Sequence, residues 1–374
     1  MEFLSLKQKA FGLDISDLSI KIVNLKKKGK FFKLSSWGET NIKQGIIENG
    51  IIKNEKVLSE IIKQGLKKVK GEKIKTKNVI VSLPEKKAFV QVIRMPKMKN
   101  EELKTAVSFE AENYIPLPIE KVYLDFEIIP SIKGYSNKYI DVLVVAIPKK
   151  IVDSYILLLK EVGLSPIAFE IESQSISRAL VKNNISPSPL LFVDFGKSKT
   201  TFIVFSGYSM QFTSSIPISS FMLTEAISKF FKINLVEAKK IKKEYGFQRF
   251  LEDGSEISKK KKIISQEVFE IMIPILTDLV EQIKKYIDYY ETFSNKRLSV
   301  KNKNIKKVIL CGRGANLKGL PDFLFSELGI PIEYGNPWVN ILPAPLKEVP
   351  QLSFQKSLGY VTVLGLALRG NINE

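Results

Sequence analysis

Histidine is absent from the 374 residues of this chain, and cysteine occurs only once. Without histidine there is no Ser-His-Asp triad and no imidazole to act as a general acid or base near neutral pH. Zinc sites, which mostly use histidine or several cysteines, are excluded for the same reason. The composition thus removes several common classes of hydrolase and metalloenzyme.

The single cysteine, Cys311, cannot form a disulfide within the chain. Val308, Ile309 and Leu310 precede it and Gly312 follows it. This pattern is typical of a buried strand that ends in a turn. We therefore expect a buried thiol.

Arginine is scarce although the chain is strongly basic. Of 58 basic residues six are arginine, which leaves 52 lysines and a formal net charge of +19. Arginine is the usual bidentate reader of phosphate and guanine, whereas scattered lysines mostly cover solvated helix faces. The composition therefore argues against nucleic acid as a partner. Attraction to an anionic membrane surface needs no specific contact and is favoured instead.

Long apolar runs are also missing. No stretch reaches the ~20 residues that a membrane-spanning helix needs. Met1 to Lys9 is mixed polar and lacks the apolar core of a signal peptide. The sequence predicts a cytoplasmic protein without a transmembrane span.

The length and a hydrophobic content of 44% are sufficient for two domains. The most informative stretch runs from Leu190 to Phe205. Apolar residues lead to Asp194, and a second apolar run leaves after a turn that contains Gly196, Ser198, Lys199 and Thr200. Backbone N–H groups in such a turn can cradle a phosphate, and a carboxylate at the end of the strand can hold Mg²⁺ through water. An ordinary β-hairpin is the alternative.

A second copy of this pattern lies near the N-terminus, from Phe11 to Val23. Its strand ends in Asp14, and its turn and outgoing strand contain Ser16, Asp17, Ser19 and Lys21. Self-similarity at this separation predicts two similar lobes rather than a solenoid. Two facing hairpins of this kind would clamp a polyphosphate from both sides.

Paired phosphate hairpins resemble those of the actin, Hsp70 and sugar-kinase superfamily. The chain is most similar to one FtsA-like branch, the PilM family of type IV pilus assembly proteins. The similar segments cover the chain in order: 12–14, 110–118, 193–196, 215–218, 314–320 and 364–368. The resemblance implies an α/β, actin-like ATPase fold with two lobes of duplicated subdomains and a small FtsA-like insert.

The resemblance also implies domain boundaries. The first lobe would be 1–188, with core segments 1–84 and 150–188, an insert at 85–149 and a C-terminal helix at 355–374. The second lobe would be 189–354, with core segments 189–225 and 304–354 and a helical subdomain at 226–303. The periodicity of residues 85–149 independently predicts a strand, a helix and two further strands.

For the site, the resemblance implies ATP and Mg²⁺ as cofactors. Asp14 and Asp194 would lie near the metal, and Glu172 would face the attacking water. Helix-dipole stabilisation at a helix N-terminus is the alternative role for Glu172. The residues expected near the nucleotide are Ser16, Asp17, Ser19, Lys21, Gly196, Ser198, Lys199, Thr200, Lys242, Gly312, Gly314 and Ala315.

Three residues depart from the family pattern: Ser16, Lys239 and Arg313. Lys239 replaces a glutamate that would accept a hydrogen bond from the nucleoside, and Arg313 replaces a glycine. A degenerate adaptor that binds no nucleotide is therefore an open alternative. Any hydrolysis is expected to be slow, because no second base and no arginine finger are evident.

The implied partner is the cytoplasmic N-terminal peptide of a PilN-like inner-membrane protein, with a pilus assembly ATPase as a further partner. The peptide would enter a groove between the first lobe and the insert, which the apolar segment Tyr114–Leu117 could line. Packing within the insert explains the same segment equally well. Partners would hold the protein at the inner face of the inner membrane. An FtsA-like division protein and a small-molecule kinase remain further alternatives.

Overall fold

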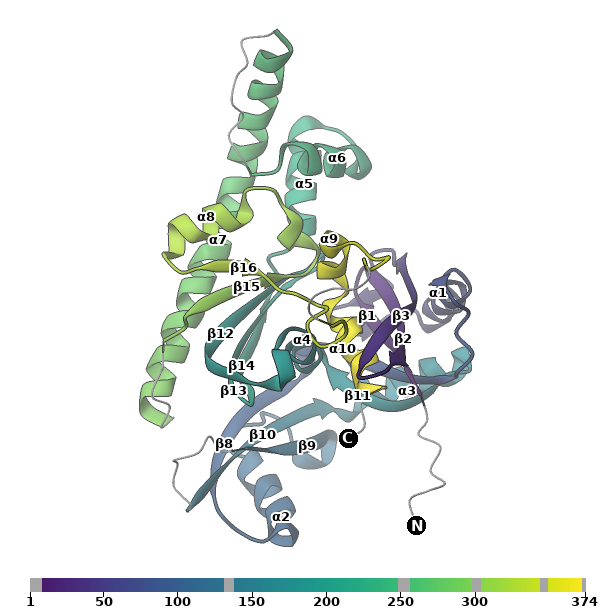
Figure 1. Ribbon diagram of the computed structural model, residues 1–374, viewed down its shortest axis with the longest axis vertical. Helices are drawn as coiled ribbons and strands as arrows, with labels where there is room; N and C mark the ends of the chain where they lie inside the picture. The colour runs from purple at the N-terminus through teal and green to yellow at the C-terminus, as the bar shows by residue number, and fades with distance from the viewer. Residues whose placement is uncertain (1–8, 131–137, 248–255, 298–303, 344–348, 372–374) are drawn as a thin grey trace. The chain divides into compact units, whose positions relative to one another are not determined.

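The computed structural model describes residues 9–130, 138–247, 256–297, 304–343 and 349–371. The chain divides into two compact units (Figure 1). Unit 1 contains Met1–Pro187, Phe205–Ser214 and Asn336–Glu374. Unit 2 contains Ser188–Val204 and Ser215–Gly335.

The main sheet of unit 1 has six strands in the order β11-β7-β1-β2-β3-β6. Strand β1 pairs in parallel with β7 and antiparallel with β2. Their bounds are β1 Phe11–Ser16, β2 Ser19–Lys28, β3 Phe31–Asn41, β6 Lys70–Gly71, β7 Asn78–Leu83 and β11 Ser165–Ile171. A small ladder and two helices complete this part: β4 Ile47–Glu48, β5 Ile51–Ile52, α1 Glu55–Lys67 and α3 Lys149–Val162.

Successive side chains of β1 point to opposite sides of the sheet, so the strand has two different faces. Leu13 and Ile15 pair with Ile22 and Ile20 of β2, and the latter two side chains reach Gly65 of α1. The opposite face carries Gly12 and Asp14 and is covered by the last helix. One apolar face is therefore buried under α1, and the predicted acidic residue lies on the other face.

The C-terminal helix packs closely onto this sheet and onto a neighbouring helix. A β carbon at Gly12 would lie 2.6 Å from the Val363 carbonyl oxygen, and one at Gly365 only 1.9 Å from that of Ser175. Glycine permits both approaches because it has no side chain. The helices involved are α4 Glu172–Leu180, α9 Phe354–Ser357 and α10 Val361–Arg369.

The insert is a three-stranded antiparallel sheet, in the order β8-β10-β9, with one helix. Val142, Val144 and Ala146 face a core shared with the helix residues Leu103 and Val107. The bounds are β8 Phe89–Pro96, α2 Asn100–Ala111, β9 Val122–Ile129 and β10 Tyr139–Pro148. This is the strand–helix–strand–strand pattern that the periodicity predicts.

Unit 2 is built on a five-stranded sheet in the order β14-β13-β12-β15-β16. Strand β15 pairs in parallel with both β12 and β16. The strands are β12 Ser186–Phe195, β13 Thr200–Gly207, β14 Ser209–Ile216, β15 Lys307–Cys311 and β16 Ile332–Tyr334. The helices are α5 Ser220–Phe231, α6 Leu235–Tyr245, α7 Glu256–Arg297 and α8 Leu320–Leu328.

Short 3₁₀ helices connect several of these elements. They are η1 Glu85–Lys87, η2 Ile119–Lys121, η3 Lys182–Asn184, η4 Arg313–Asn316 and η5 Leu358–Tyr360. None of the helices in the described part of the chain combines the length and apolar character that crossing a membrane requires.

The unit boundaries differ from the expected lobes in two places. Residues 336–354 were expected in the second lobe, but they group with unit 1, because Trp338, Ile341 and Leu352 are buried with Val363. Phe205–Ser214 also groups with unit 1. The end of the β13–β14 hairpin therefore contributes to unit 1 although its strands belong to the sheet of unit 2.

Candidate functional site

The first predicted hairpin joins β1 and β2 through a two-residue turn, Asp17–Leu18. Asp14 and Lys21 are cross-strand partners and form an ion pair of 3.2 Å. The second carboxylate oxygen of Asp14 accepts from Ser82 Oγ at 2.9 Å. Asp14 is only 4% exposed, so these two contacts hold its side chain in a fixed orientation.

The turn residues of this hairpin are also engaged. Ser16 Oγ donates to the Ser19 carbonyl oxygen at 2.8 Å and lies 3.1 Å from the Ser19 hydroxyl. The Asp17 carboxylate accepts from the backbone N–H groups of Asn49 and Gly50 at 3.0 and 2.9 Å. Asp17 thus fastens the β4–β5 loop to the hairpin, which is a positioning role.

A buried tyrosine marks the place where three predicted carboxylates gather. Tyr155 of α3 is fully buried, and its hydroxyl donates to the Gly50 carbonyl oxygen at 3.2 Å. Burial raises the pKa of Tyr155, and the negative charges of Glu172, Asp17 and Asp14 raise it further. The structure therefore brings these carboxylates into one region of unit 1.

Glu172 lies in the first turn of α4 and is 6% exposed. A second acid, which the sequence did not single out, holds the same helix end. Buried Glu85 accepts from the Ser173 backbone N–H and hydroxyl at 3.0 and 2.8 Å, and from Thr213 Oγ1 at 2.8 Å. A carboxylate at a helix N-terminus is stabilised by the helix dipole. Glu85 thereby fixes the helix that carries Glu172.

The second predicted hairpin joins β12 and β13. The Gly196 N–H donates to the Lys199 carbonyl oxygen at 2.9 Å, and a β carbon at Gly196 would lie 2.6 Å from that oxygen. The turn is therefore closed by a glycine-dependent contact. Ser198 and Lys199 are half-buried. Thr200 is fully buried, and its hydroxyl donates to the Ile218 carbonyl oxygen at 2.7 Å.

The glycine-containing turn after β15, residues 312–315, packs directly on the second hairpin. Gly312 has a φ of +82°, and a β carbon there would lie 2.3 Å from Asp194 Oδ1. A β carbon at Gly314 would lie 2.5 Å from the Phe195 ring, and Ala315 is fully buried. Close backbone packing thus requires both glycines. Burial and the charge of Asp194, its strand partner, raise the pKa of the Cys311 thiol.

Lys242 reaches the same hairpin through Ser220. Its amine donates to the Ser220 carbonyl oxygen and lies 3.3 Å from the Ser220 hydroxyl. The Ser220 N–H in turn donates to the Gly196 carbonyl oxygen at 3.0 Å. Loss of hydration lowers the pKa of Lys242 to about 8, and the neighbouring charge of Lys239 adds to this. The predicted residues of unit 2 therefore converge around Gly196 and Asp194.

A pocket of about 750 Å³ lies within unit 1, beside the insert. Five successive residues of the edge strand β9, Tyr123–Glu127, line it. Leu143, Val145 and Ile147 of β10 also line it, and they alternate with the residues that face α2. The expected lining segment Tyr114–Leu117 is elsewhere, since Ile115 and Leu117 pack in the insert core. Further lining residues come from α3, β11, α4 and the β13–β14 hairpin, and β7, η3 and α10 contribute one residue each.

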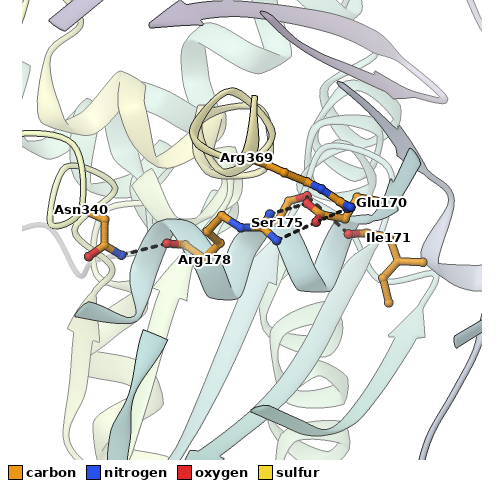
Figure 2. Close-up of polar contacts among 6 residues, drawn as sticks. All are labelled: Glu170, Ile171, Ser175, Arg178, Asn340 and Arg369. Atoms are coloured by element: carbon orange, nitrogen blue, oxygen red, sulfur yellow. Dashed lines mark hydrogen bonds and ion pairs between the residues drawn. The ribbon is translucent and has the colours of Figure 1, made fainter. Parts of the chain in front are cut away.

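A buried ion network forms one wall of this pocket (Figure 2). The Glu170 side chain is fully buried, and both Arg178 and Arg369 pair with it. Ser175 Oγ donates to the same carboxylate at 2.7 Å, and Asn340 Nδ2 donates to the Arg178 carbonyl oxygen at 2.8 Å. Figure 2 shows both guanidinium groups directed at Glu170. A single carboxylate therefore accepts hydrogen bonds from both guanidinium groups.

Residues 12–371 match the family described as type IV pilus assembly protein PilM. The chain belongs to this family. Among solved structures, a PilM-PilN type IV pilus biogenesis complex is similar with a TM-score of 0.78 at 24% identity, over 98% of this chain and 100% of that one. The predicted family is therefore confirmed.

Two further structures share the fold of this PilM family member. MreB 5 of Spiroplasma citri bound to AMPPNP has a TM-score of 0.55 at 11% identity, over 96% of this chain and 95% of that one. The ethanolamine utilization protein EutJ from Carboxydothermus hydrogenoformans has a TM-score of 0.53 at 14% identity, over 96% and 89%. The predicted actin-like α/β fold is confirmed.

Sequence reasoning missed the acids and arginines that depend on distant contacts. Glu85, Tyr155 and Glu170 carry no motif, and each has at least one partner more than 80 positions away along the chain. The one available signal was an acid directly after Pro84, the proline that follows the strand ending at Leu83. That signal does not identify Ser173 and Thr213 as the partners of Glu85.

Proposed function

We propose that this protein is a cytoplasmic, ATP- and Mg²⁺-binding component of the type IV pilus inner-membrane assembly platform. It would bind the N-terminal cytoplasmic peptide of a PilN-like membrane protein and stay at the inner face of the membrane through that contact. Membership of the PilM family and the actin-like fold support this proposal. A pilus assembly ATPase is a further proposed partner.

The pocket of unit 1 is the observation that carries the partner proposal. Its volume of about 750 Å³ falls in the range of ligand-binding sites, and its walls combine apolar side chains with charged ones. Strand β9 forms the edge of the insert sheet, so an extended peptide can pair with its backbone there. The solved PilM relative is a complex with PilN, which supports a peptide as the occupant.

Fluorescence anisotropy with a labelled synthetic peptide tests the partner. The peptide is the cytoplasmic N-terminal segment of the PilN-like protein from the same genome. Val145→Glu places a charge on the pocket wall, and we expect it to weaken binding at least tenfold. Val57→Glu is the control, because Val57 is an exposed aliphatic residue of α1 that does not line the pocket. Equal binding by both variants would contradict this assignment.

The nucleotide proposal depends on two sets of residues, one in each unit. Carboxylate oxygens are the ligands that Mg²⁺ prefers, and its sites commonly use one or two carboxylates with water and phosphate. Asp14, already engaged by Lys21 and Ser82, fits a contact through water. Asp194 is half-buried at the end of β12. In each unit a lysine of the hairpin, Lys21 in unit 1 and Lys199 in unit 2, would offset the charge of a phosphate bound at that hairpin.

The adaptor alternative has its own support. Packing against Asp194 and Phe195 explains Gly312 and Gly314 without a nucleoside. Asp17 and Thr200 already have backbone partners. A relative that had lost nucleotide binding would keep such side chains, because their hydrogen bonds within the chain stabilise the fold.

Isothermal titration with Mg²⁺–ATP separates the two functions. Micromolar binding that Asp194→Ala abolishes supports the ATP-binding protein. Undetectable ATP binding with unchanged peptide affinity supports the adaptor. Chelation of Mg²⁺ during the titration then shows whether the metal contributes to the nucleotide affinity.

A further inference from the structure

The turn end of the β2–β3 hairpin concentrates positive charge. Residues 26–33, called the lysine hairpin below, contain Lys26, Lys27, Lys28, Lys30 and Lys33 and no acid. All five lysines are exposed. These lysines are a small part of the 52 in the chain, but they follow one another closely along the ends of β2 and β3, the purple strands of Figure 1.

The strand register gives the lysine hairpin two different faces. Leu25 and Leu34 are paired, and both are buried in a cluster with Trp338 and Ile341. Phe32 packs against this cluster, and its N–H donates to the Ile341 carbonyl oxygen at 2.8 Å. One face therefore anchors the hairpin to the core.

The other face carries charge and an aromatic ring. Alternation places Lys26, Lys28, Phe31 and Lys33 together on it, with Lys26 opposite Lys33 and Lys28 opposite Phe31. Like charges directly opposite one another destabilise a sheet. Glu72 compensates in part: it pairs with Lys26, and hydrogen bonding to Lys26 and the charge of Lys33 lower the pKa of Glu72. Residues 26–33 themselves supply no further acid.

A basic face of this kind could bind either nucleic acid or an anionic membrane, and Phe31 distinguishes between the two. Its side chain is 40% exposed, next to the turn and among the lysines. Aromatic rings are enriched where a membrane meets water, and lysines beside them meet anionic headgroups. Nucleic-acid surfaces favour arginine, and residues 9–93 contain none. The combination of charge and an exposed ring fits a lipid surface.

We propose that the lysine hairpin docks directly on anionic phospholipid headgroups, with Phe31 inserted at the interface. This contact does not require the partner peptide or a nucleotide. It would add a second attachment point and orient unit 1 at the membrane. Each lysine near an anionic surface increases the partitioning of the protein onto the membrane about fivefold, and this attraction decreases as the salt concentration rises.

Flotation with vesicles of phosphatidylglycerol and phosphatidylcholine tests the contact with the full chain alone. We expect binding that requires the anionic lipid and that Lys28→Glu, Lys30→Glu and Lys33→Glu together reduce at least tenfold. The matched control reverses three exposed lysines of α6, Lys239, Lys240 and Lys243. Equal losses in the two triple variants, or no binding by the unmodified chain, would overturn the proposal.

Tryptophan fluorescence tests the insertion of the ring. Phe31→Trp should shift its emission to the blue when anionic vesicles are added. Phe230→Trp, at an exposed phenylalanine of α5, should show no shift. Phe31→Ser should weaken vesicle binding and leave any binding to duplex DNA unchanged. If the lysine hairpin binds DNA and Phe31→Ser leaves vesicle binding unaltered, the partner is nucleic acid and the lipid proposal fails.

Discussion

Gly312 stands directly against Asp194: a β carbon at position 312 would lie 2.3 Å from the Asp194 Oδ1 atom. The backbone there has φ +82° and ψ 166°, a region that is almost exclusive to glycine. The turn at residues 312–315 and the second hairpin therefore pack together and cannot move independently. A side chain at Gly312 would move the carboxylate proposed to lie near the metal.

Gly312→Ala should destabilise unit 2 by about 1–3 kcal/mol from backbone conformation, with a further loss from the clash. It should also weaken any Mg²⁺–ATP binding. Urea unfolding and calorimetry measure the two effects. Gly329→Ala is the control, since Gly329 also has a positive φ but no atom within 4 Å of a β carbon. It should cost about 1 kcal/mol and leave ATP binding unchanged.

Ser177 and Ser175 of α4 should respond in opposite ways to alanine. Ser177 Oγ is buried and has no hydrogen-bond partner among the described residues, whereas Ser175 Oγ donates to Glu170. Ser177→Ala should leave stability unchanged or raise it by about 1 kcal/mol. Ser175→Ala should lower it by about 1–3 kcal/mol. Thermal unfolding of both variants checks the signs, and a clear loss from Ser177→Ala would contradict the assigned burial.

The lowered pKa of Lys242 predicts how stability depends on pH. Its pKa is about 8 in the folded chain against an ordinary value of 10.5, so the unfolded state binds more protons between these values. Stability relative to Lys242→Met should therefore rise as pH increases from about 8 to 10.5, by about 2 kcal/mol. Urea unfolding of both proteins across this range measures the difference. A flat difference would show that Lys242 is fully hydrated.

The same lysine provides a test of the nucleotide site. An anion bound beside Lys242 would favour its protonated form and raise its pKa. Mg²⁺–ATP binding near pH 8 should then take up protons, and Lys242→Met should abolish the uptake. Titrations in two buffers of different ionisation enthalpy measure it. ATP binding without proton uptake would place the nucleotide away from Lys242.

The Asp14–Lys21 pair should show energetic coupling. Asp14→Ala leaves Lys21 and Ser82 without their carboxylate partner, and we expect a loss of about 2–3 kcal/mol. Adding Lys21→Met should recover part of this loss, because the amine that lost the Asp14 carboxylate is removed. A double-mutant cycle in urea measures the coupling. Strict additivity would show that the pair contributes nothing to the hairpin.

The parts of the fold that could be predicted are those with local signals. The two hairpins follow from apolar strands around turns with glycine, hydroxyls and an acid. The insert follows from strand and helix periodicity in residues 85–149. In both cases neighbours in sequence are neighbours in space, so a pattern of a few residues contains the information.

The Glu170 network and the pocket could not be predicted in this way. Glu170 and Arg369 are 199 positions apart, and neither lies in a motif. Their pairing depends on how α10 packs on α4, and the close backbone approach at Gly365 is one condition for this packing. The unit boundary near residue 336 escaped prediction for a similar reason, since Trp338 and Ile341 pack on strands made at the start of the chain.

The contact between Gly12 and the Val363 carbonyl oxygen joins the first strand of the chain to its last helix. During translation, unit 2 is therefore synthesised in full before unit 1 receives the helix that covers β1. The face of the N-terminal sheet that α10 covers therefore stays exposed in the nascent chain until about residue 369 has left the ribosome. Shielding of that face by a chaperone, or by the ribosome itself, would be needed for most of the synthesis time.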